Sequence, residues 1–272
     1  MHIAVVGCGW LGLPLAISLQ ESGHNIVATC RSEEKASDLS KLGFDSGKFE
    51  LGNDLTHNRL AKVFASQVLI LNIPVGRKTL TTEHFLQHMQ ALLKYASTSQ
   101  IQNVIFISTT SVYGNNNGIV TEQSRTDPQT QSGQINVAVE ALVRKYFTDR
   151  STIIRPAGLI GKDRHPANYL AAKTGLLNPD SVVNLVHQDD VVRAIKTVIE
   201  KDIWGQTLHL SALAHPTRAE YYTWAAENLS LTPPEFIKGT GMPVGKRIDA
   251  SRSLQVLGLA LKYASPFDML RQ

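Results

Sequence analysis

Short apolar runs alternate with longer segments of helical periodicity through the first 155 residues of the chain. The apolar runs, which we interpret as strands, are Ile3–Val6, Ile26–Thr29, a weaker one at Phe44–Leu51, Val68–Ile73, Val104–Ser108 and Thr152–Arg155. The segments with helical spacing are Leu11–Ser22, Glu33–Leu42, Thr82–Tyr95 and Ile135–Phe147. Continuous apolar runs are typical of strands covered on both faces, and this alternation predicts an α/β fold with a doubly wound parallel sheet.

The regular alternation of predicted strands and helices ends after Pro156. A stretch rich in Gly, Pro and Asn, residues 158–179, precedes the remaining elements. These are a helix at Asp189–Glu200, a strand at Leu208–Leu210 and helices at Arg218–Leu229 and Ser251–Leu257. No linker composition separates them from the first part of the chain. We expect residues 1–155 to form a core, and residues 156–272 to complete the sheet and form a small C-terminal substrate lobe within one integrated domain.

The first apolar run ends in a glycine-rich turn with the spacing G-x-G-x-x-G, formed by Gly7, Gly9 and Gly12. Gly7 permits the tight turn, Gly9 lets the backbone approach a pyrophosphate, and Gly12 lets the helix pack closely on the strand. The N–H groups of the turn and of the helix start, around Trp10 and Leu11, then face the phosphates. This pattern between a strand and a helix predicts dinucleotide binding by a Rossmann fold.

The tip of the second strand distinguishes the two nicotinamide dinucleotides. An acidic residue about twenty positions past the glycines normally accepts the ribose 2′-hydroxyl of NAD. Here Arg31 follows the strand and no Asp or Glu stands at the tip, so we favour NADP over NAD. Asp54 follows the third strand, and Asn72 and Pro74 stand at the end of the fourth. All three are candidates for the adenosine side, although turn roles fit them equally well.

Charge and composition exclude several classes of function. The net charge of +4 is thinly spread, and no basic stripe with aromatic residues indicates nucleic-acid binding. The apolar stretch Ile3–Leu19 lacks a basic region before it and is shorter than the ~20 residues of a membrane span. The two cysteines, Cys8 and Cys30, are typical of a reducing compartment. We therefore expect a cytoplasmic protein that binds neither nucleic acid nor membrane.

From the fifth strand onward, several ordered motifs resemble those of the extended short-chain dehydrogenases/reductases, the nucleotide-sugar epimerase and dehydratase group. They are Ile107-Ser-Thr-Thr-Ser-Val-Tyr-Gly114, Thr121-Glu122 with Pro128, Arg155-Pro-Ala-Gly-Leu-Ile-Gly161, Val186-His-Gln-Asp-Asp-Val191, and Lys246-Arg247 with Leu257-Gly258. The resemblance implies that Thr109 supplies a catalytic hydroxyl beside the nicotinamide, and that Ser108 and Pro156 line the cofactor. It also implies a homodimer, formed through the helices at 82–95 and 135–147, and no metal.

The chain departs from this family at its catalytic pair, Tyr-x-x-x-Lys. Ser132 stands where the tyrosine is expected and Asn136 where the lysine is expected. A phenol has a pKa near 10 that an ammonium and the nicotinamide charge lower, whereas a serine hydroxyl is a poor acid or base at pH 7. Asn136 retains the ability to hydrogen-bond a ribose hydroxyl. Glu140, one helical turn further on, is expected to be an ordinary helix residue.

Three residues are candidates to replace the missing tyrosine: Glu122, which would act as a base if partly desolvated, His165 and Tyr169. Two functions stay open. The first is an atypical NADP-dependent oxidoreductase or epimerase-like enzyme for a small-molecule substrate, with Thr109, Ser132 and Glu122 at its reacting centre. The second is a regulatory protein that senses NADP(H) without turnover. We favour the enzyme, because a site that positions and polarises a substrate beside a cofactor can still be active.

Overall fold

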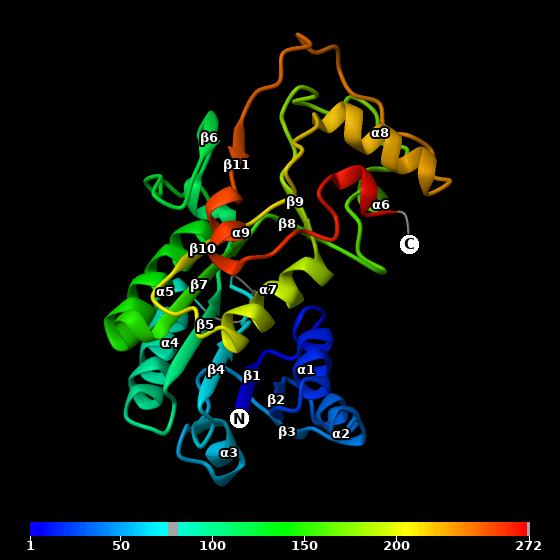
Figure 1. Cartoon of the computed structure of the whole chain (residues 1–272). Helices are drawn as coiled ribbons and strands as arrows, with labels where there is room; N and C mark the ends of the chain where they lie inside the picture. The colour runs from blue at the N-terminus through cyan, green and yellow to red at the C-terminus, as the bar shows by residue number, and fades with distance from the viewer. Residues whose placement is uncertain (76–80, 271–272) are drawn as a thin grey trace.

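A computed structural model describes residues 1–75 and 81–270, and its centre is a parallel seven-stranded sheet (Figure 1). The strand order is β10-β7-β5-β4-β1-β2-β3. These strands are β1 (His2–Val6), β2 (Asn25–Cys30), β3 (Asp45–Lys48), β4 (Val68–Leu71), β5 (Asn103–Ile107), β7 (Ser151–Pro156) and β10 (Thr207–Leu210). The order runs outward from β1 in both directions, which confirms the predicted doubly wound Rossmann fold.

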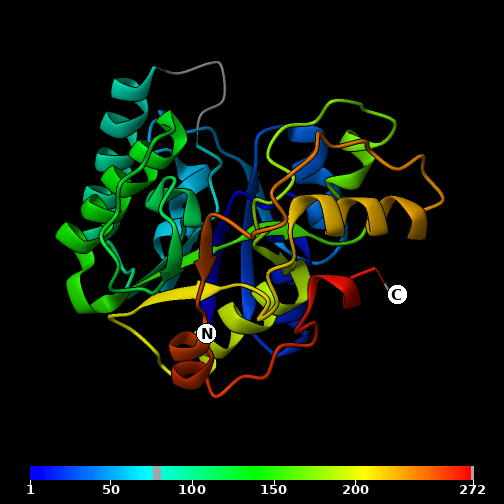
Figure 2. The ribbon, with the colours of Figure 1, turned by 90° about the horizontal axis from the view of Figure 1, so that it is seen from above.

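Helices cover both faces of this sheet (Figure 2). One face carries α1 (Gly12–Glu21), α2 (Glu33–Lys41) and α7 (Gln188–Glu200), and the other carries α3 (Ala61–Phe64), α4 (Thr82–Ser97) and α5 (Gln131–Phe147). Successive residues of a strand enter opposite cores. In β1, Ile3 and Val5 pack under α1, whereas Ala4 and Val6 pack under α4 and α5. This burial on two faces explains why the central strands are continuous apolar runs.

The residues after Pro156 contribute β10 to the sheet and form a lobe above the carboxyl ends of the strands (Figure 1). The lobe contains β8 (Gly158–Ile160), β9 (Leu185–His187), α6 (Ala167–Leu170) and α8 (Arg218–Asn228). Next come β11 (Lys246–Ile248), which pairs with β6 (Gly118–Val120), and α9 (Ser251–Leu257). Tyr221 and Ala225 of α8 are central to a separate core within the lobe.

The structure differs from the sequence expectations mainly at element ends and in short strands. Helix α5 begins four residues before the expected Ile135, because the Thr130 hydroxyl caps it by accepting from the Gly133 amide at 3.1 Å. Strand β3 covers only the middle of the expected run Phe44–Leu51. Strands β6, β8, β9 and β11 were not expected, since three residues are too few to show a periodic pattern.

Asp190 joins the C-terminal segment to α7. Its carboxylate is completely buried and accepts the amides of Lys262 at 2.7 Å and Tyr263 at 3.1 Å, and Arg193 Nη1 at 3.0 Å. At the start of the same helix, His187 Nδ1 accepts from the Asp189 amide, and the His187 ring lies 4.2 Å from the Tyr263 ring. The His-x-x-Asp motif therefore fixes the C-terminal segment to the sheet.

Replacing Asp190 by Asn should lower the free energy of unfolding by about 2–3 kcal/mol, because charge-assisted hydrogen bonds are lost in a buried site. The adjacent Asp189 is a matched control: its carboxylate pairs with Lys262 at the surface, where both side chains are about half exposed. Asp189→Asn should cost less than about 1 kcal/mol. Urea unfolding of both variants measures the difference, and equal losses would contradict this role of Asp190.

Candidate functional site

Gly7 and Gly12 of the glycine-rich turn are required by close backbone contacts. Gly7 has φ +97°, and a Cβ at this position would lie 2.3 Å from the Asn72 carbonyl oxygen. A Cβ at Gly12 would lie 2.5 Å from the Gly7 carbonyl oxygen. Asn72, at the end of β4, donates its Nδ2 hydrogen to that same oxygen at 2.9 Å. The turn is thus held against the carboxyl end of β4, and a side chain at Gly7 or Gly12 would displace it.

Gly9 lies at an open position of the same turn. The nearest atom to a Cβ added there is the Gly7 oxygen, at 3.9 Å. The α1 helix begins at Gly12, and no side chain of the described residues caps its first residue. The helices α3, α6 and α9 also lack a side-chain cap, whereas α2, α4, α5, α7 and α8 each have one. No side chain therefore occupies the N–H groups at the start of α1, and an anion-binding turn needs such N–H groups.

Trp10 and Leu11 have different environments in this turn. Leu11 is buried in the core under α1, with 4% of its surface exposed. Trp10 is half-buried and faces the lobe, and its carbonyl oxygen accepts the Gln188 side-chain amide at 2.6 Å. The turn is therefore fixed both to the sheet and to the start of α7.

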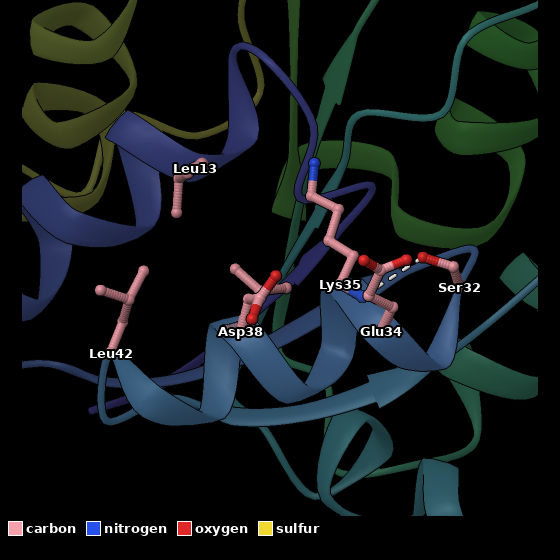
Figure 3. Close-up of a pocket in the computed structure, with 7 residues that line it drawn as sticks. Leu13, Ser32, Glu34, Lys35, Asp38 and Leu42 are labelled. Carbon is pink, nitrogen blue, oxygen red and sulfur yellow. Dashed lines mark hydrogen bonds between the residues drawn. The ribbon is translucent and has the colours of Figure 1, made fainter.

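Two cations, Arg31 and Lys35, lie at the tip of β2 and the start of α2, next to Glu33 and Glu34. Arg31 is exposed, and Ser32 caps α2 by accepting from the Lys35 amide. The Lys35 side chain rises from α2 toward the loop between β1 and α1, beside a shallow cavity of about 310 Å³ (Figure 3). Burial raises the pKa of the Cys8 thiol to about 11, and the Lys35 ammonium acts against this rise. Sequence reasoning missed Lys35, because only the fold brings α2 beside the glycine-rich turn.

Asp54 and Pro74 lie on the expected adenosine side, in loops after β3 and β4. The Asp54 carboxylate accepts the Thr56 hydroxyl at 2.7 Å and the Thr56 amide at 2.9 Å, and these bonds hold its pKa below the usual value. Both Asp54 and Pro74 are exposed. A Cβ at Gly52 would lie 2.7 Å from the His88 ring of α4, so this loop lies close against α4. The roles of these residues toward a cofactor stay predictions.

The end of β5 presents two hydroxyls that have different partners. Ser108 is buried and its hydroxyl donates to the Glu140 carboxylate of α5. The half-buried Thr109 hydroxyl accepts from the Ser111 amide at 3.1 Å and so starts a short 3₁₀ helix, Thr110–Tyr113. Thr109 therefore has a fixed orientation at the carboxyl edge of the sheet, where ligands bind in folds of this type.

The sequence led us to expect an ordinary helix residue at Glu140, and this expectation is wrong. Its carboxylate is buried and pairs with Arg155 of β7 through both oxygens, one of them 2.9 Å from Arg155 Nε. Arg155 Nη1 also donates to the Tyr113 hydroxyl at 2.6 Å. The buried pair thus links α5, β7 and the loop after β5.

The Tyr113 hydroxyl donates in turn to His209 Nε2 of β10 at 2.5 Å, while His209 Nδ1 donates to the Asp249 carbonyl at 2.9 Å. Burial lowers the pKa of His209, in keeping with this neutral form, and burial raises the pKa of Tyr113. Tyr113 is fully buried. It therefore holds strands and loop together and does not reach a substrate.

The predicted catalytic and ribose-binding residues of α5 adjoin one another. Ser132 is exposed on the first turn, and Asn136 is buried with its Nδ2 donating to the Ser132 carbonyl at 2.8 Å. The Glu122 carboxylate accepts the Ser253 hydroxyl of α9, and Pro156 is buried at the end of β7. The catalytic roles of Ser132 and Glu122, and the cofactor contacts of Asn136 and Pro156, stay predictions.

His165 and Tyr169 are in unlike settings. Tyr169 is exposed on α6, whereas His165 is buried in the lobe. His165 Nδ1 accepts the Ala167 amide at 3.1 Å, so its proton is on Nε2 and is donated to the Tyr221 hydroxyl at 2.8 Å. Burial lowers the pKa of His165 to about 4. The ring is a fixed, neutral part of the lobe core.

The described residues show neither a membrane-spanning helix nor a metal cluster. In residues 1–75 and 81–270, each helix is too short or too polar to cross a bilayer. No group of three His, Cys, Asp or Glu side chains gathers there as a metal site requires. The expected homodimer and the cytoplasmic location stay predictions.

The chain belongs to the NAD dependent epimerase/dehydratase family, whose model matches residues 3–208. This result confirms the resemblance to the extended short-chain dehydrogenases/reductases. Among curated proteins, Protein YeeZ of Escherichia coli strain K12 is 34% identical over 271 residues, which cover 98% of each chain.

Solved structures share the fold along nearly the whole chain. UDP-glucuronic acid 4-epimerase of Bacillus cereus, in complex with NAD, has a TM-score of 0.78 at 19% identity and covers 99% of this chain and 96% of its own. A Methylobacillus flagellatus protein assigned to the NAD-dependent epimerases/dehydratases has a TM-score of 0.80 at 22% identity, with coverage of 98% and 95%. The family description names NAD, so our ranking of NAD behind NADP is not supported.

Because His165 is buried, the free energy of unfolding should depend on pH below neutrality. Because its pKa falls from 6.5 to about 4 on folding, the unfolded chain binds a proton first as the pH drops through this range. The free energy of unfolding should therefore fall between pH 6.5 and 4, by up to about 3 kcal/mol. In His165→Gln this slope should flatten, whereas His84→Gln, at an exposed histidine of α4, should keep it. Urea unfolding across this pH range decides, and an unchanged slope in His165→Gln would refute the assignment.

Proposed function

We propose that this chain is an epimerase/dehydratase-like oxidoreductase that binds a nicotinamide dinucleotide on Gly7, Gly9 and Gly12. The observation that carries the proposal is the open backbone at Gly9 beside the uncapped start of α1. Both features fit a pyrophosphate, whose charges need N–H donors and a close backbone approach. Asp54, Asn72 and Pro74 would line the adenosine side, and Ser108, Asn136 and Pro156 the nicotinamide side.

Arg31 and Lys35 favour binding of the 2′-phosphate of NADP, although the family description names NAD. The two cations belong to the tip of β2 and the first turn of α2, and no carboxylate stands at the tip itself, since Glu33 and Glu34 follow in the first turn of α2. An arginine fork and an ammonium are the groups that bind a phosphate dianion. We therefore propose that both dinucleotides bind and that the 2′-phosphate adds affinity.

Thr109 is the residue we propose to orient a substrate carbonyl or hydroxyl. A bound nicotinamide ring supplies the hydride chemistry, so the chain has to position the substrate and manage one proton. Ser132 would hold an ordered water in place of the missing phenol, and Glu122 would serve as a base. Since no lysine stands at position 136 to lower a neighbouring pKa, we expect slower proton transfer than in the rest of the family.

The lobe would select the substrate. It stands above the carboxyl ends of the strands, where open α/β sheets bind their ligands (Figure 1). The Bacillus cereus neighbour acts on UDP-glucuronic acid, and a small molecule of this general kind is our proposal for the ligand class. We also propose that residues 156–272 fold together with the core as one domain, since β10 belongs to the central sheet.

A sensor of NADP(H) without turnover is the second candidate. It is favoured by the side chain of Asn136, which is buried and bound to the Ser132 carbonyl rather than directed to a reacting group. Purified protein incubated with NADPH or NADH and a panel of carbonyl substrates separates the two functions. Oxidation of the cofactor establishes the enzyme, and tight binding without turnover supports the sensor.

The double variant Arg31→Ala/Lys35→Ala should weaken NADPH binding by about tenfold or more and NADH binding by less than about twofold, because only NADPH carries the 2′-phosphate. Lys41→Ala, at the far end of the same helix, is the control and should change neither affinity. Fluorescence titration gives both dissociation constants. Equal losses of affinity for NADPH and NADH would contradict a role of Arg31 and Lys35 at the 2′-phosphate. Failure of the native chain to bind either cofactor would overturn the proposed function.

Restoring the catalytic pair tests the reacting centre. Ser132→Tyr/Asn136→Lys should raise the rate of carbonyl reduction by about tenfold or more, within the range that a positioned general acid contributes. Ser132→Tyr alone lacks the ammonium and should gain less. Cofactor oxidation is followed by absorbance after circular dichroism has shown that both variants fold. A folded double variant without any gain would indicate a cleft rebuilt for another purpose.

A further inference from the structure

A tight turn of the lobe, Gly161–Arg164, lies against the glycine-rich turn of the core. The Gly161 amide donates to the Arg164 carbonyl at 3.1 Å, and the Arg164 amide donates back at 3.0 Å. Asp163 within it has φ 61°, a conformation that closes the turn sharply. The two bonds make this segment a compact unit that projects from the end of β8.

The lobe turn packs against the side chain of Trp10. The Trp10 indole N–H donates to the Lys162 carbonyl at 3.3 Å, and the Arg164 guanidinium carbon lies 4.8 Å from the centroid of the indole ring. A Cβ at Gly161 would lie 3.1 Å from Trp10 Cζ2, so the backbone of the lobe turn packs tightly against the indole. Residues more than 150 positions apart in the sequence thus meet at the glycine-rich turn.

The lobe turn carries two cations, Lys162 and Arg164, and one carboxylate, Asp163. Lys162 and Arg164 are both exposed, and within residues 1–75 and 81–270 neither side chain forms an ion pair or donates a hydrogen bond. Stacking on an indole orients a guanidinium but leaves its N–H groups available. The Arg164 guanidinium therefore lies over Trp10, two residues before α1 begins, and the start of a helix attracts anions.

We propose that Arg164, held over the Trp10 ring, belongs to the dinucleotide site and pairs with the cofactor pyrophosphate. This inference rests on the proposed function and adds to it a contact from the lobe. The pyrophosphate would then bind N–H groups of the glycine-rich turn on one side and the guanidinium fork on the other, with Lys162 adding charge. Cofactor binding would in this way fix the lobe over the core before a substrate enters.

The test is Arg164→Gln, titrated calorimetrically with NADH and with ADP-ribose, which keeps the pyrophosphate but lacks the nicotinamide ring. Both ligands should bind about tenfold more weakly than to the native chain, the loss of one charge-assisted contact. Arg164→Lys keeps the positive charge but lacks the paired N–H donors of a guanidinium. Its affinities for both ligands should therefore lie between those of the native chain and those of Arg164→Gln. Because Arg164 is exposed, thermal unfolding should be unchanged.

Arg218→Gln is the matched control, since Arg218 also lies over an aromatic ring of the lobe, that of Phe236 at 5.6 Å. It should bind both ligands as the native chain does. Native-like binding by Arg164→Gln would overturn the inference while leaving the proposed function intact. If the native chain binds neither NADH nor NADPH, the proposed function itself fails. An equal loss in Arg218→Gln would indicate a general loosening of the lobe and would likewise overturn the role of Arg164.

Discussion

The buried pair of Glu140 and Arg155 is the interaction on which the centre of this molecule depends. Each side chain is less than a tenth exposed, and a single charge in that position would be strongly destabilising without its partner. Around the pair, the Ser108 hydroxyl, the Tyr113 phenol and through it the His209 ring are held by hydrogen bonds. Two strands, a helix and the loop that carries Thr109 are thereby fixed relative to one another at the carboxyl edge of the sheet.

The two halves of the proposed site differ in what they are made of. The phosphate half consists of backbone: a Cβ at Gly7 or Gly12 would lie 2.3 or 2.5 Å from a backbone oxygen, and the start of α1 offers N–H groups. The reacting half depends on side chains, and there Ser132 and Asn136 replace the expected tyrosine and lysine. A backbone site tolerates many substitutions nearby, whereas proton transfer needs particular pKa values. We therefore expect cofactor binding to tolerate sequence change more readily than the chemistry typical of the family does.

The fold and the glycine-rich turn could be predicted from the sequence because both depend on residues that lie close together along the chain. Apolar runs of four to six residues, covered on both faces, gave β1, β2, β4, β5 and β7 nearly within their limits, and three glycines within six positions gave the turn. The start of α5 was misplaced because a Thr130 cap in a polar stretch outweighs apolar periodicity. The three-residue strands of the lobe carry no periodic pattern at all, so they were missed.

The sequence by itself determined the class of fold, the glycine-rich turn and the loss of the catalytic tyrosine and lysine, since each is a matter of residue type at short spacing. Only the tertiary structure decided which charges act together. Glu140 meets a serine 32 residues away, Lys35 approaches the turn from a neighbouring helix, and Arg164 reaches Trp10 from the lobe. Side chains so distant along the chain are brought together by the packing of sheet and helices. For the buried Glu140 the fold has to supply a partner, because an unpaired buried charge is strongly destabilising.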